Sequence, residues 1–342
     1  MQTSDAPPIK GSPPAPHRAT SPLLWPVAAL LLLLVFNALF TPGFMSVEVR
    51  DGHLYGSLID IANRGAPVML LTIGMTLVIA TGGIDLSVGA VMAIAGAFAA
   101  ILITQHDAPL AVVLGGAFAV SILAGVWNGL LVAGLGIQPI VATLILMVSG
   151  RGIAQLMTDG QIPTFHNAPI SFLGKGFLFG LPFSITVVVL TALVAWLLVR
   201  KTALGLFIES VGANEKASRY AGINAWSVKM FVYVFCAFCA GLAGLIEVAN
   251  ITAADANNLG LNRELDAILA AVIGGTALTG GRFSLPGSIL GALIIQSLNT
   301  TILSRGVAVE LTLVVKAVVV LAVCLLQSEA FRRTIIRRRA SA

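Results

Sequence analysis

The chain has 342 residues, of which 57% are hydrophobic and only 10% are charged. Soluble domains carry about 25% charged residues, so this composition excludes an ordinary soluble protein and makes a lipid bilayer the expected surroundings. The net charge of +5 comes from basic residues that are scattered over loops and a tail, and nucleic acid is therefore excluded as a partner.

Ten apolar stretches follow a proline-rich start. Residues 1–22 carry few large apolar side chains, so we expect a disordered cytoplasmic tail there. Several stretches reach the ~18 apolar residues that suggest a membrane span. We expect an all-α membrane protein with about ten transmembrane helices in a domain over residues 23–326, and a basic cytoplasmic tail at residues 327–342. The approximate spans are 23–40, 66–82, 87–103, 109–134, 140–157, 178–199, 230–249, 265–279, 285–304 and 307–326.

The basic residues indicate which side the termini occupy. An even number of spans puts both termini on one side, and Lys and Arg collect in cytoplasmic loops. With cytoplasmic termini, the inside set is Lys10, Arg18, Arg200, Lys201, Lys216, Arg219, Lys229, Arg282, Arg332, Arg333, Arg337, Arg338 and Arg339. The outside set is only Arg50, Arg64, Lys175, Arg263 and Arg305. This count favours cytoplasmic termini.

A polar break lies between the second and third spans, at residues 81–89, which read Thr-Gly-Gly-Ile-Asp-Leu-Ser-Val-Gly. Backbone at membrane depth needs hydrogen-bond partners, so the break must be shielded by protein or lie at an aqueous vestibule. Asp85 or Ser87 can cap the next helix, and we favour that role over direct contact with a solute, although the two are compatible. Gln138, which precedes Pro139, is likewise interpreted first as a helix start.

The same glycine spacing recurs near the other end of the chain. Thr-Gly-Gly, five residues and Gly at residues 81–89 match residues 279–287. In transporters, Gly-interrupted segments at corresponding places point toward the transport site, and we therefore expect broken or half-length helices near the midplane. Chance explains the echo equally well, because glycine is frequent in membrane helices.

The longest cytoplasmic loop, Arg200 to Lys229, contains a predicted short helix. Asn214 can cap it, Glu215 suits the positive end of the helix dipole, and Gly222 can adopt the left-handed stop conformation. Two turns of helix are unstable alone, so this helix must dock on the chain's own spans or on another chain. The pattern G-x-x-x-x-G-K-[ST] does not occur, so any ATP-driven motor would be a separate subunit.

Residues 82–89 resemble the signature of the ribose-type ABC sugar permeases, and so do the cytoplasmic loop, residues 264–268 and residues 272–276. The likeness runs from about residue 23 to residue 326. Within that family, residues 73–97 and 138–147 are most similar to the galactofuranose importer permeases. The resemblance implies a multi-pass permease of the bacterial inner membrane that translocates a monosaccharide. The predicted sugar is galactofuranose, and ribose or another monosaccharide is the alternative.

The resemblance also implies partners. Such permeases work as a pair, identical or different, with two ATP-binding subunits and a periplasmic sugar-binding protein. We therefore expect no enzyme activity in this chain, and no cofactor, since ATP is bound by a partner. The loop helix would couple ATP hydrolysis to gating, a role that falls on Asn214, Glu215, Ala217, Arg219, Tyr220 and Gly222.

Several polar side chains within spans are candidates for lining the passage or its gate. Besides Asp85, Ser87 and Gln138, they are Asn128, Thr143, Gln296 and Asn299, and each could instead bond a neighbouring helix. Lys316 is a lone cation near the middle of the last span. It is too deep to reach the interface easily, so we expect an acidic partner or a polar cavity.

Two other classes of function are less well supported. An ion-coupled secondary carrier would need embedded acids or histidines, whereas the four histidines lie outside the predicted spans and the spans hold almost no acids. A membrane enzyme would need a catalytic or metal-binding constellation. Cys236 and Cys239 form a C-x-x-C inside an apolar run with no further ligands beside them, so we expect no metal site.

Overall fold

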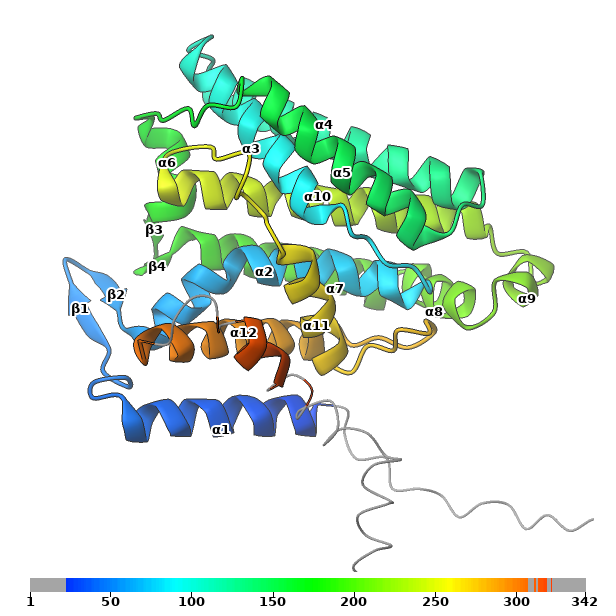
Figure 1. The fold of residues 1–342 in the computed structure, drawn as a ribbon. Helices are drawn as coiled ribbons and strands as arrows, with labels where there is room; N and C mark the ends of the chain where they lie inside the picture. The colour runs from blue at the N-terminus through cyan, green and yellow to red at the C-terminus, as the bar shows by residue number, and fades with distance from the viewer. Residues whose placement is uncertain (1–22, 307–310, 312, 319–320, 322–342) are drawn as a thin grey trace, which may run out of the picture.

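The computed structural model describes residues 23–306, 311, 313–318 and 321, and this part of the chain is mostly helical (Figure 1). The tails expected at residues 1–22 and 327–342 lie outside the described residues, as does much of the last predicted span. The long elements are α1 (Leu24–Phe40), α2 (Ser57–Ala80), α3 (Val88–Thr104), α4 (Leu110–Gly129), α5 (Pro139–Met157), α7 (Phe183–Lys201), α10 (Ala225–Ile251), α11 (Arg263–Ile273) and α12 (Leu285–Ser304). The short elements are η1 (Leu130–Gly134), α6 (Ala168–Lys175), α8 (Leu204–Ala213), α9 (Glu215–Tyr220), β1 (Glu48–Arg50), β2 (His53–Tyr55), β3 (Phe177–Leu178) and β4 (Leu181–Pro182).

Among the residues that the structure describes, six helices are long and apolar enough to cross a membrane: α2, α4 with its π-helical extension η1, α5, α7, α10 and α12. The apolar helices α1 and α3 are slightly shorter, at 17 residues each. With 11 residues, α11 is ~17 Å long, about half the thickness of the hydrocarbon layer. An all-helical membrane fold is therefore confirmed, while the total of ten spans stays a prediction.

Four predicted boundaries were wrong, and one of them is the start of the span predicted at residue 230, which begins at Ala225 in α10. The second span starts at Ser57 instead of residue 66. The prediction missed its first turns because Asp60, Asn63 and Arg64 lower their hydropathy. Residues 178–182 are not helical, since they form the antiparallel hairpin β3–β4, and α7 starts after Pro182. The span predicted to end at residue 279 stops at Ile273, where the second glycine-rich segment begins.

The core is built around α2 and α10, which lie in the middle of the bundle (Figure 1). Apolar side chains surround α2 on all sides, as is typical of a helix packed on every face. Packed around this pair are α3 and α4 on one side and α11 and α12 on the other. This arrangement places both glycine-rich breaks, residues 81–87 between α2 and α3 and residues 274–284 between α11 and α12, next to the most buried helices.

Glycines let these helices approach closely. A Cβ atom at Gly244 of α10 would lie 2.5 Å from the carbonyl oxygen of Met92 in α3. A Cβ at Gly74 of α2 would lie 2.7 Å from the Cα of Cys236 in α10. In lipid, where there is little hydrophobic driving force between helices, such close backbone packing stabilises the bundle.

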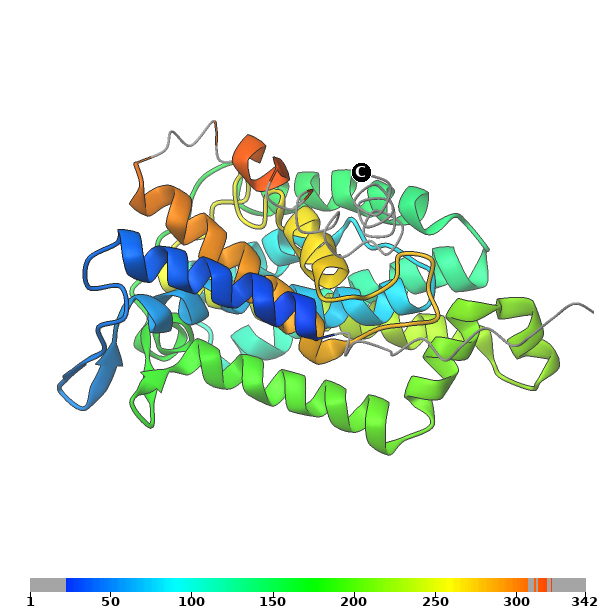
Figure 2. The same ribbon diagram turned by 90° about the horizontal axis from the view of Figure 1, so that it is seen from below.

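A buried polar contact joins the first helix to the bundle. Asn37 of α1 donates from its side chain to Thr301 Oγ1 of α12 over 2.7 Å, and both side chains are buried. Figure 2 shows α1 and α12 running side by side. An amide in an otherwise apolar helix thus fixes how α1 sits on the bundle.

The bundle has two ends that the loops distinguish. Leu23, Arg200, Glu209 and Ser284 line one cavity of ≈ 510 Å³, so the starts of α1, α8 and α12 share one end, here called the α9 end. At the opposite end, the hairpin end, Arg305 lies over the rings of Phe36 and Phe40. The start of α1 and two of the predicted inside loops, the one that follows α7 and the one that precedes α12, therefore lie together.

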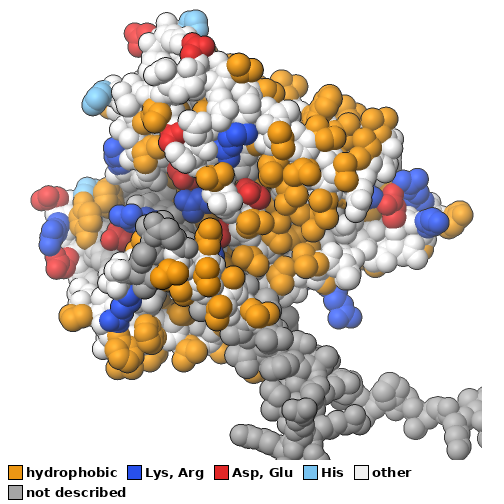
Figure 3. Space-filling model, viewed as in Figure 1, with side chains coloured by type: hydrophobic (Ala, Val, Ile, Leu, Met, Phe, Trp, Pro, Cys, Tyr) orange, Lys and Arg blue, Asp and Glu red, His pale blue; other side chains and the backbone are white. Residues whose placement is uncertain are grey.

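The outer helices expose apolar side chains. Leu123 of α4, Val148 of α5 and Val189 of α7 are 66%, 66% and 59% exposed. Figure 3 shows hydrophobic side chains over much of the visible face, with charged side chains at its two ends and near its middle. The exposed apolar side chains of the outer helices match a surface that lipid tails cover.

We predict that Gly244→Val destabilises the bundle, because the added side chain forces α10 away from the backbone of α3. Overpacking of a close contact costs about 1–3 kcal/mol. Thermal unfolding of the purified protein in detergent measures the effect. Gly115→Val is the matched control, since a Cβ at this α4 position meets nothing within 4 Å. Equal melting temperatures for the two variants would contradict the role of Gly244.

Candidate functional site

The break between α2 and α3 is a compact turn whose backbone is internally bonded. The amides of Thr81 and Gly83 both donate to the carbonyl of Val78, each over 3.1 Å. The hydroxyl of Thr81 donates to the same carbonyl over 2.8 Å. The end of α2 therefore satisfies these backbone groups by bonds within the chain.

Asp85 lies within this break and is 1% exposed. Its Oδ1 accepts hydrogen bonds from the backbone amide of Ser87 over 2.9 Å and from the Ser87 hydroxyl over 2.6 Å. Neither side chain bonds the first turn of α3, so the predicted capping role was wrong. Ser87 has helical backbone angles, φ −82° and ψ −10°, instead of the extended conformation in which a cap oxygen reaches the next turn.

Two further helices bring polar side chains to the break. Asn128 of α4 donates from Nδ2 to Ser87 Oγ over 2.8 Å. Thr143 of α5 accepts from the Leu86 amide over 3.1 Å. Four of the predicted passage residues therefore meet in one group, which we call the buried polar cluster: Asp85, Ser87, Asn128 and Thr143.

Tyr233 is a member of this region that sequence reasoning missed. It lies in α10, is fully buried, and a Cβ at Gly83 would be 2.6 Å from its hydroxyl. Within the described part of the chain, the Tyr233 hydroxyl, Asp85 Oδ2 and Asn128 Oδ1 have no hydrogen-bond partner. The buried polar cluster thus retains two acceptors, and Tyr233 adds one hydroxyl donor beside it; such groups bind water or a sugar hydroxyl.

The remaining passage candidates lie elsewhere. Gln138 is exposed and precedes Pro139 at the first turn of α5, so the predicted helix start is confirmed there. Gln296 of α12 is buried, and its Cβ and Cγ would lie 3.2 Å from a Cβ at Gly65 of α2. Asn299 also lies in α12, one turn further along the helix. None of these three side chains is hydrogen-bonded to the buried polar cluster in the described structure.

Lys316 has an acidic partner. Its Nζ lies 2.8 Å from Asp266 Oδ1 in the first turn of α11, and the two side chains are only 11% and 10% exposed. A lone buried charge is costly, and pairing offsets part of that cost. The expected pair is therefore present and joins α11 to the described part of the last helix.

The predicted loop helix is α9, and it stands beyond the end of the bundle (Figure 1). Asn214 Oδ1 accepts from the Ala217 amide over 3.0 Å, which confirms the predicted cap. Gly222 follows the helix with φ +84°, the left-handed conformation that the stop requires. A second helix in this loop, α8, was not predicted, and Lys229 belongs to α10 instead of the loop.

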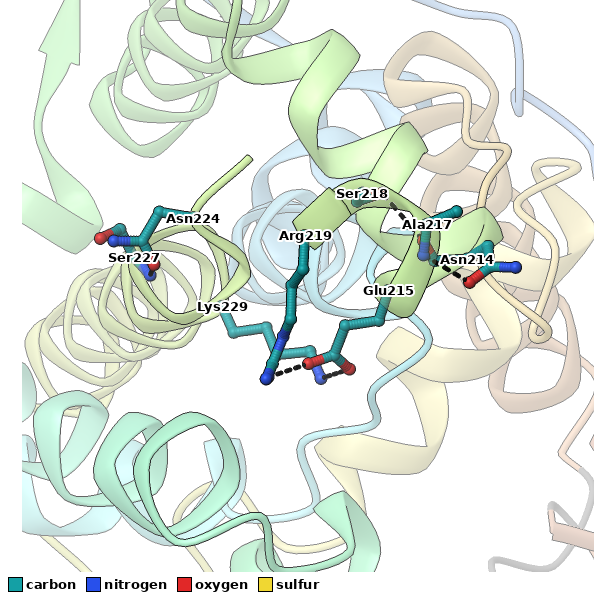
Figure 4. Close-up of polar contacts among 8 residues, drawn as sticks. All are labelled: Asn214, Glu215, Ala217, Ser218, Arg219, Asn224, Ser227 and Lys229. Carbon is teal, nitrogen blue, oxygen red and sulfur yellow. Dashed lines mark hydrogen bonds and ion pairs between the residues drawn. The ribbon is translucent and has the colours of Figure 1, made fainter. Parts of the chain in front are cut away.

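Glu215 ties α9 to the bundle. Its carboxylate lies 2.6 Å from both Arg219 in α9 and Lys229 in α10, as Figure 4 shows. Partial burial opposes ionisation of Glu215, but the hydrogen bonds and charges of Lys229 and Arg219 outweigh it and lower the pKa of this carboxyl below its usual value. This stabilisation is present above the ordinary pKa of Glu and is lost only as the pH falls through the lowered value.

The other face of α9 is free. Tyr220 is 93% exposed, whereas Ser218 is buried toward the bundle. A cavity of ≈ 470 Å³ lies beside this helix and is lined by Ala133, Arg219, Gly222, Ile223, Asn224, Ala225 and Trp226. An exposed tyrosine beside a hollow is typical of a protein-binding surface.

Known proteins are similar over almost the whole described region. A family model for the branched-chain amino acid transport system permease component matches residues 57–324. The galactofuranose transporter permease protein of Escherichia coli (strain K12) is 57% identical over 312 residues, which are 90% of this chain and 91% of that protein. The fructose import permease protein of Bifidobacterium longum is 40% identical over 90% of this chain and 88% of its own length. The ribose import permease protein of Escherichia coli (strain K12) is 35% identical over 88% of this chain and 92% of its own length.

We predict that Lys316→Met strongly destabilises the protein, because Asp266 is then left as an unpaired buried charge. Breaking such a pair costs about 3–5 kcal/mol. The double variant Lys316→Met with Asp266→Asn removes both charges and is expected to recover most of the loss in a thermal-unfolding measurement.

The exposed pair Arg50–Glu48 is the matched control for this cycle, since its side chains are 70% and 56% exposed. Arg50→Met is expected to change stability by less than about 1 kcal/mol. A double variant as unstable as Lys316→Met alone would contradict the pairing of Lys316 with Asp266.

Proposed function

The chain belongs to the family of branched-chain amino acid transport system permease components, and we propose that it is the permease subunit of an ATP-driven importer whose sugar is galactofuranose. The family and the helical fold make it a multi-pass protein of the inner membrane. The substrate is proposed from the relative at 57% identity, and the relatives at 40% and 35% carry fructose and ribose in their names. Ribose or another monosaccharide is the alternative within the same class.

The observation that supports an external motor is the free face of α9. The helix has six residues, is held to the bundle through Glu215, and turns Tyr220 outward. A helix this short needs a docking partner to be stable, and one face of it has none in the described structure. We propose that an ATP-binding subunit covers this face and that Asn214, Glu215, Ala217, Arg219, Tyr220 and Gly222 couple it to the permease.

The remaining parts of the proposal concern arrangement. The α9 end is cytoplasmic, in agreement with the distribution of basic residues over the loops. The permease domain covers residues 23–326, and a second permease chain and a periplasmic sugar-binding protein complete the importer. ATP binds the partner subunit, so this chain needs neither a cofactor nor an enzyme activity of its own.

One observation favours an ion-coupled carrier as the second candidate. Asp85 is a buried acid without a cationic partner among the described side chains, and embedded acids are typical of proton relays. Asp266, by contrast, is neutralised by Lys316. The energy source must therefore be tested directly.

We predict ATP-dependent uptake of labelled galactofuranose by vesicles that contain this chain with the ATP-binding and sugar-binding proteins encoded beside it. Ribose and galactopyranose serve as control sugars, and omission of the ATP-binding subunit is expected to abolish uptake. Uptake driven by an ion gradient alone would establish the carrier instead. ATP-dependent uptake of another sugar only would keep the class and replace the substrate.

We further predict that Gly222→Val lowers uptake at least about fivefold, because a branched side chain is strained at φ +84° and displaces the end of α9. The matched control is Gly136→Val, which has the same backbone strain at φ +69° and, like Gly222, no atom within 4 Å of a Cβ. Membrane insertion is measured for both variants. Equal uptake by the two would argue against a coupling role for α9.

A further inference from the structure

Three backbone segments meet at the α9 end of the bundle. They are the end of α2 at Ala80 to Gly82, the end of α8 at Gly212, and the turn at Gly280 and Gly281 that precedes α12. The amide of Gly281 donates to the carbonyl of Ala80 over 2.9 Å. In Figure 1 the end of α2, α8 and the turn before α12 lie together beside α9.

Glycine is required for this contact. A Cβ at Gly212 would lie 2.5 Å from the Gly281 amide nitrogen and closer still to the Ala80 carbonyl oxygen. A Cβ at Gly280 would lie 2.9 Å from the Gly82 amide nitrogen, and Gly280 has φ +82°, which other residues rarely adopt. We call the residues Gly82, Gly212, Gly280 and Gly281 the glycine junction.

The glycine junction also accounts for the sequence echo. Thr-Gly-Gly at residues 81–83 and at residues 279–281 supplies two of the three segments. The two copies are therefore in contact in the folded chain, and they pack backbone against backbone at the Gly82 and Gly280 positions. A chance repetition of a common tripeptide does not by itself place its two copies in contact.

Each segment leads directly to a part of the transport machinery. Gly212 is followed by Ala213 and then by Asn214, the cap of α9. Gly82 lies three residues before Asp85 of the buried polar cluster. Gly281 lies three residues before Ser284, whose hydroxyl accepts from the Gly287 amide over 3.2 Å and caps α12.

We propose that the glycine junction is a rigid connection that passes displacements of α9 to both glycine-rich breaks at once, with Gly212 as its positioning residue. This inference rests on the proposed function, because α9 must be moved by a partner. The nearest atoms to a Cβ at Gly212 or Gly280 are backbone atoms of the neighbouring segments, so these contacts have no flexible side chain to absorb a displacement. Motion of α8 therefore moves the end of α2 and the start of α12 together.

Gly212→Ala tests the positioning role. In vesicles with the partner subunits, we expect ATP hydrolysis to continue while sugar uptake per ATP hydrolysed falls at least about fivefold. A defect in folding alone lowers hydrolysis and uptake in proportion and leaves their ratio unchanged. Gly152→Ala in α5 is the matched control, because a Cβ there meets nothing within 4 Å.

A cross-link tests rigidity without relying on that variant. Ala213 and Thr279 are both exposed on either side of the junction, and Ala213 Cα would lie 3.1 Å from a Cβ at Gly281. In a cysteine-free background, Ala213→Cys and Thr279→Cys are joined by a short bifunctional maleimide, with a monofunctional maleimide as control. We expect efficient cross-linking and uptake like that of the control.

The outcomes separate the two proposals. Cross-linked protein that hydrolyses ATP without uptake, or a pair that does not cross-link in folded protein, would overturn the rigid junction. An unchanged ratio of uptake to hydrolysis in Gly212→Ala would overturn the role of Gly212 while leaving the proposed function intact. Absence of ATP-dependent uptake by the unaltered chain would overturn the proposed function and the coupling role of the junction together.

Discussion

The structure depends on one constraint: a backbone that is interrupted inside an apolar bundle must find its hydrogen bonds within the protein. The break after α2 meets this need locally, through the Val78 carbonyl, and through Thr143 of α5. The break after α11 uses the carbonyls of Ala270 and Val272 and then the carbonyl of Ala80. One break thus helps to satisfy the other, which explains why both are rich in glycine and why they lie together.

Buried carboxyl groups also need partners within the protein, and Asp266 and Asp85 differ in the partners that they have. Asp266 is neutralised by Lys316, which joins two helices through a charge pair. Asp85 has no such partner among the described side chains, and its oxygen Oδ1 is bound only by uncharged donors from Ser87 and Asn128. A paired charge favours a fixed contact, whereas a carboxyl with an unused oxygen keeps capacity for another donor.

The sequence was sufficient for what hydropathy and capping chemistry determine. The membrane helices, the cap at Asn214 and the left-handed stop at Gly222 depend on neighbouring residues, so their local signal was enough. The sequence could not identify contacts between residues that are far apart in the chain. The position of Lys316 predicted an acidic partner or a polar cavity but did not identify Asp266, and Tyr233 could not be distinguished from other aromatic side chains in an apolar run. The predicted caps at Asp85 and Ser87 failed because the backbone angles of Ser87 follow from packing with α4 and α5, which no local pattern encodes.

The buried polar cluster and α9 differ in accessibility, and this difference bears on mechanism. Asp85, Ser87, Asn128 and Thr143 are at most 1% exposed, so no solute reaches them in this conformation. The outer face of α9, in contrast, is exposed and can bind a partner. It is connected to the break after α2 through α8 and the glycine junction. If the cluster contacts sugar, the break must therefore move first, and the chain that leads from α9 through α8 into the bundle passes the glycine junction. For the buried polar cluster to open when a partner binds α9, the packed segments between them must have two discrete arrangements. The direct backbone contacts of the glycine junction would make those segments change from one arrangement to the other together.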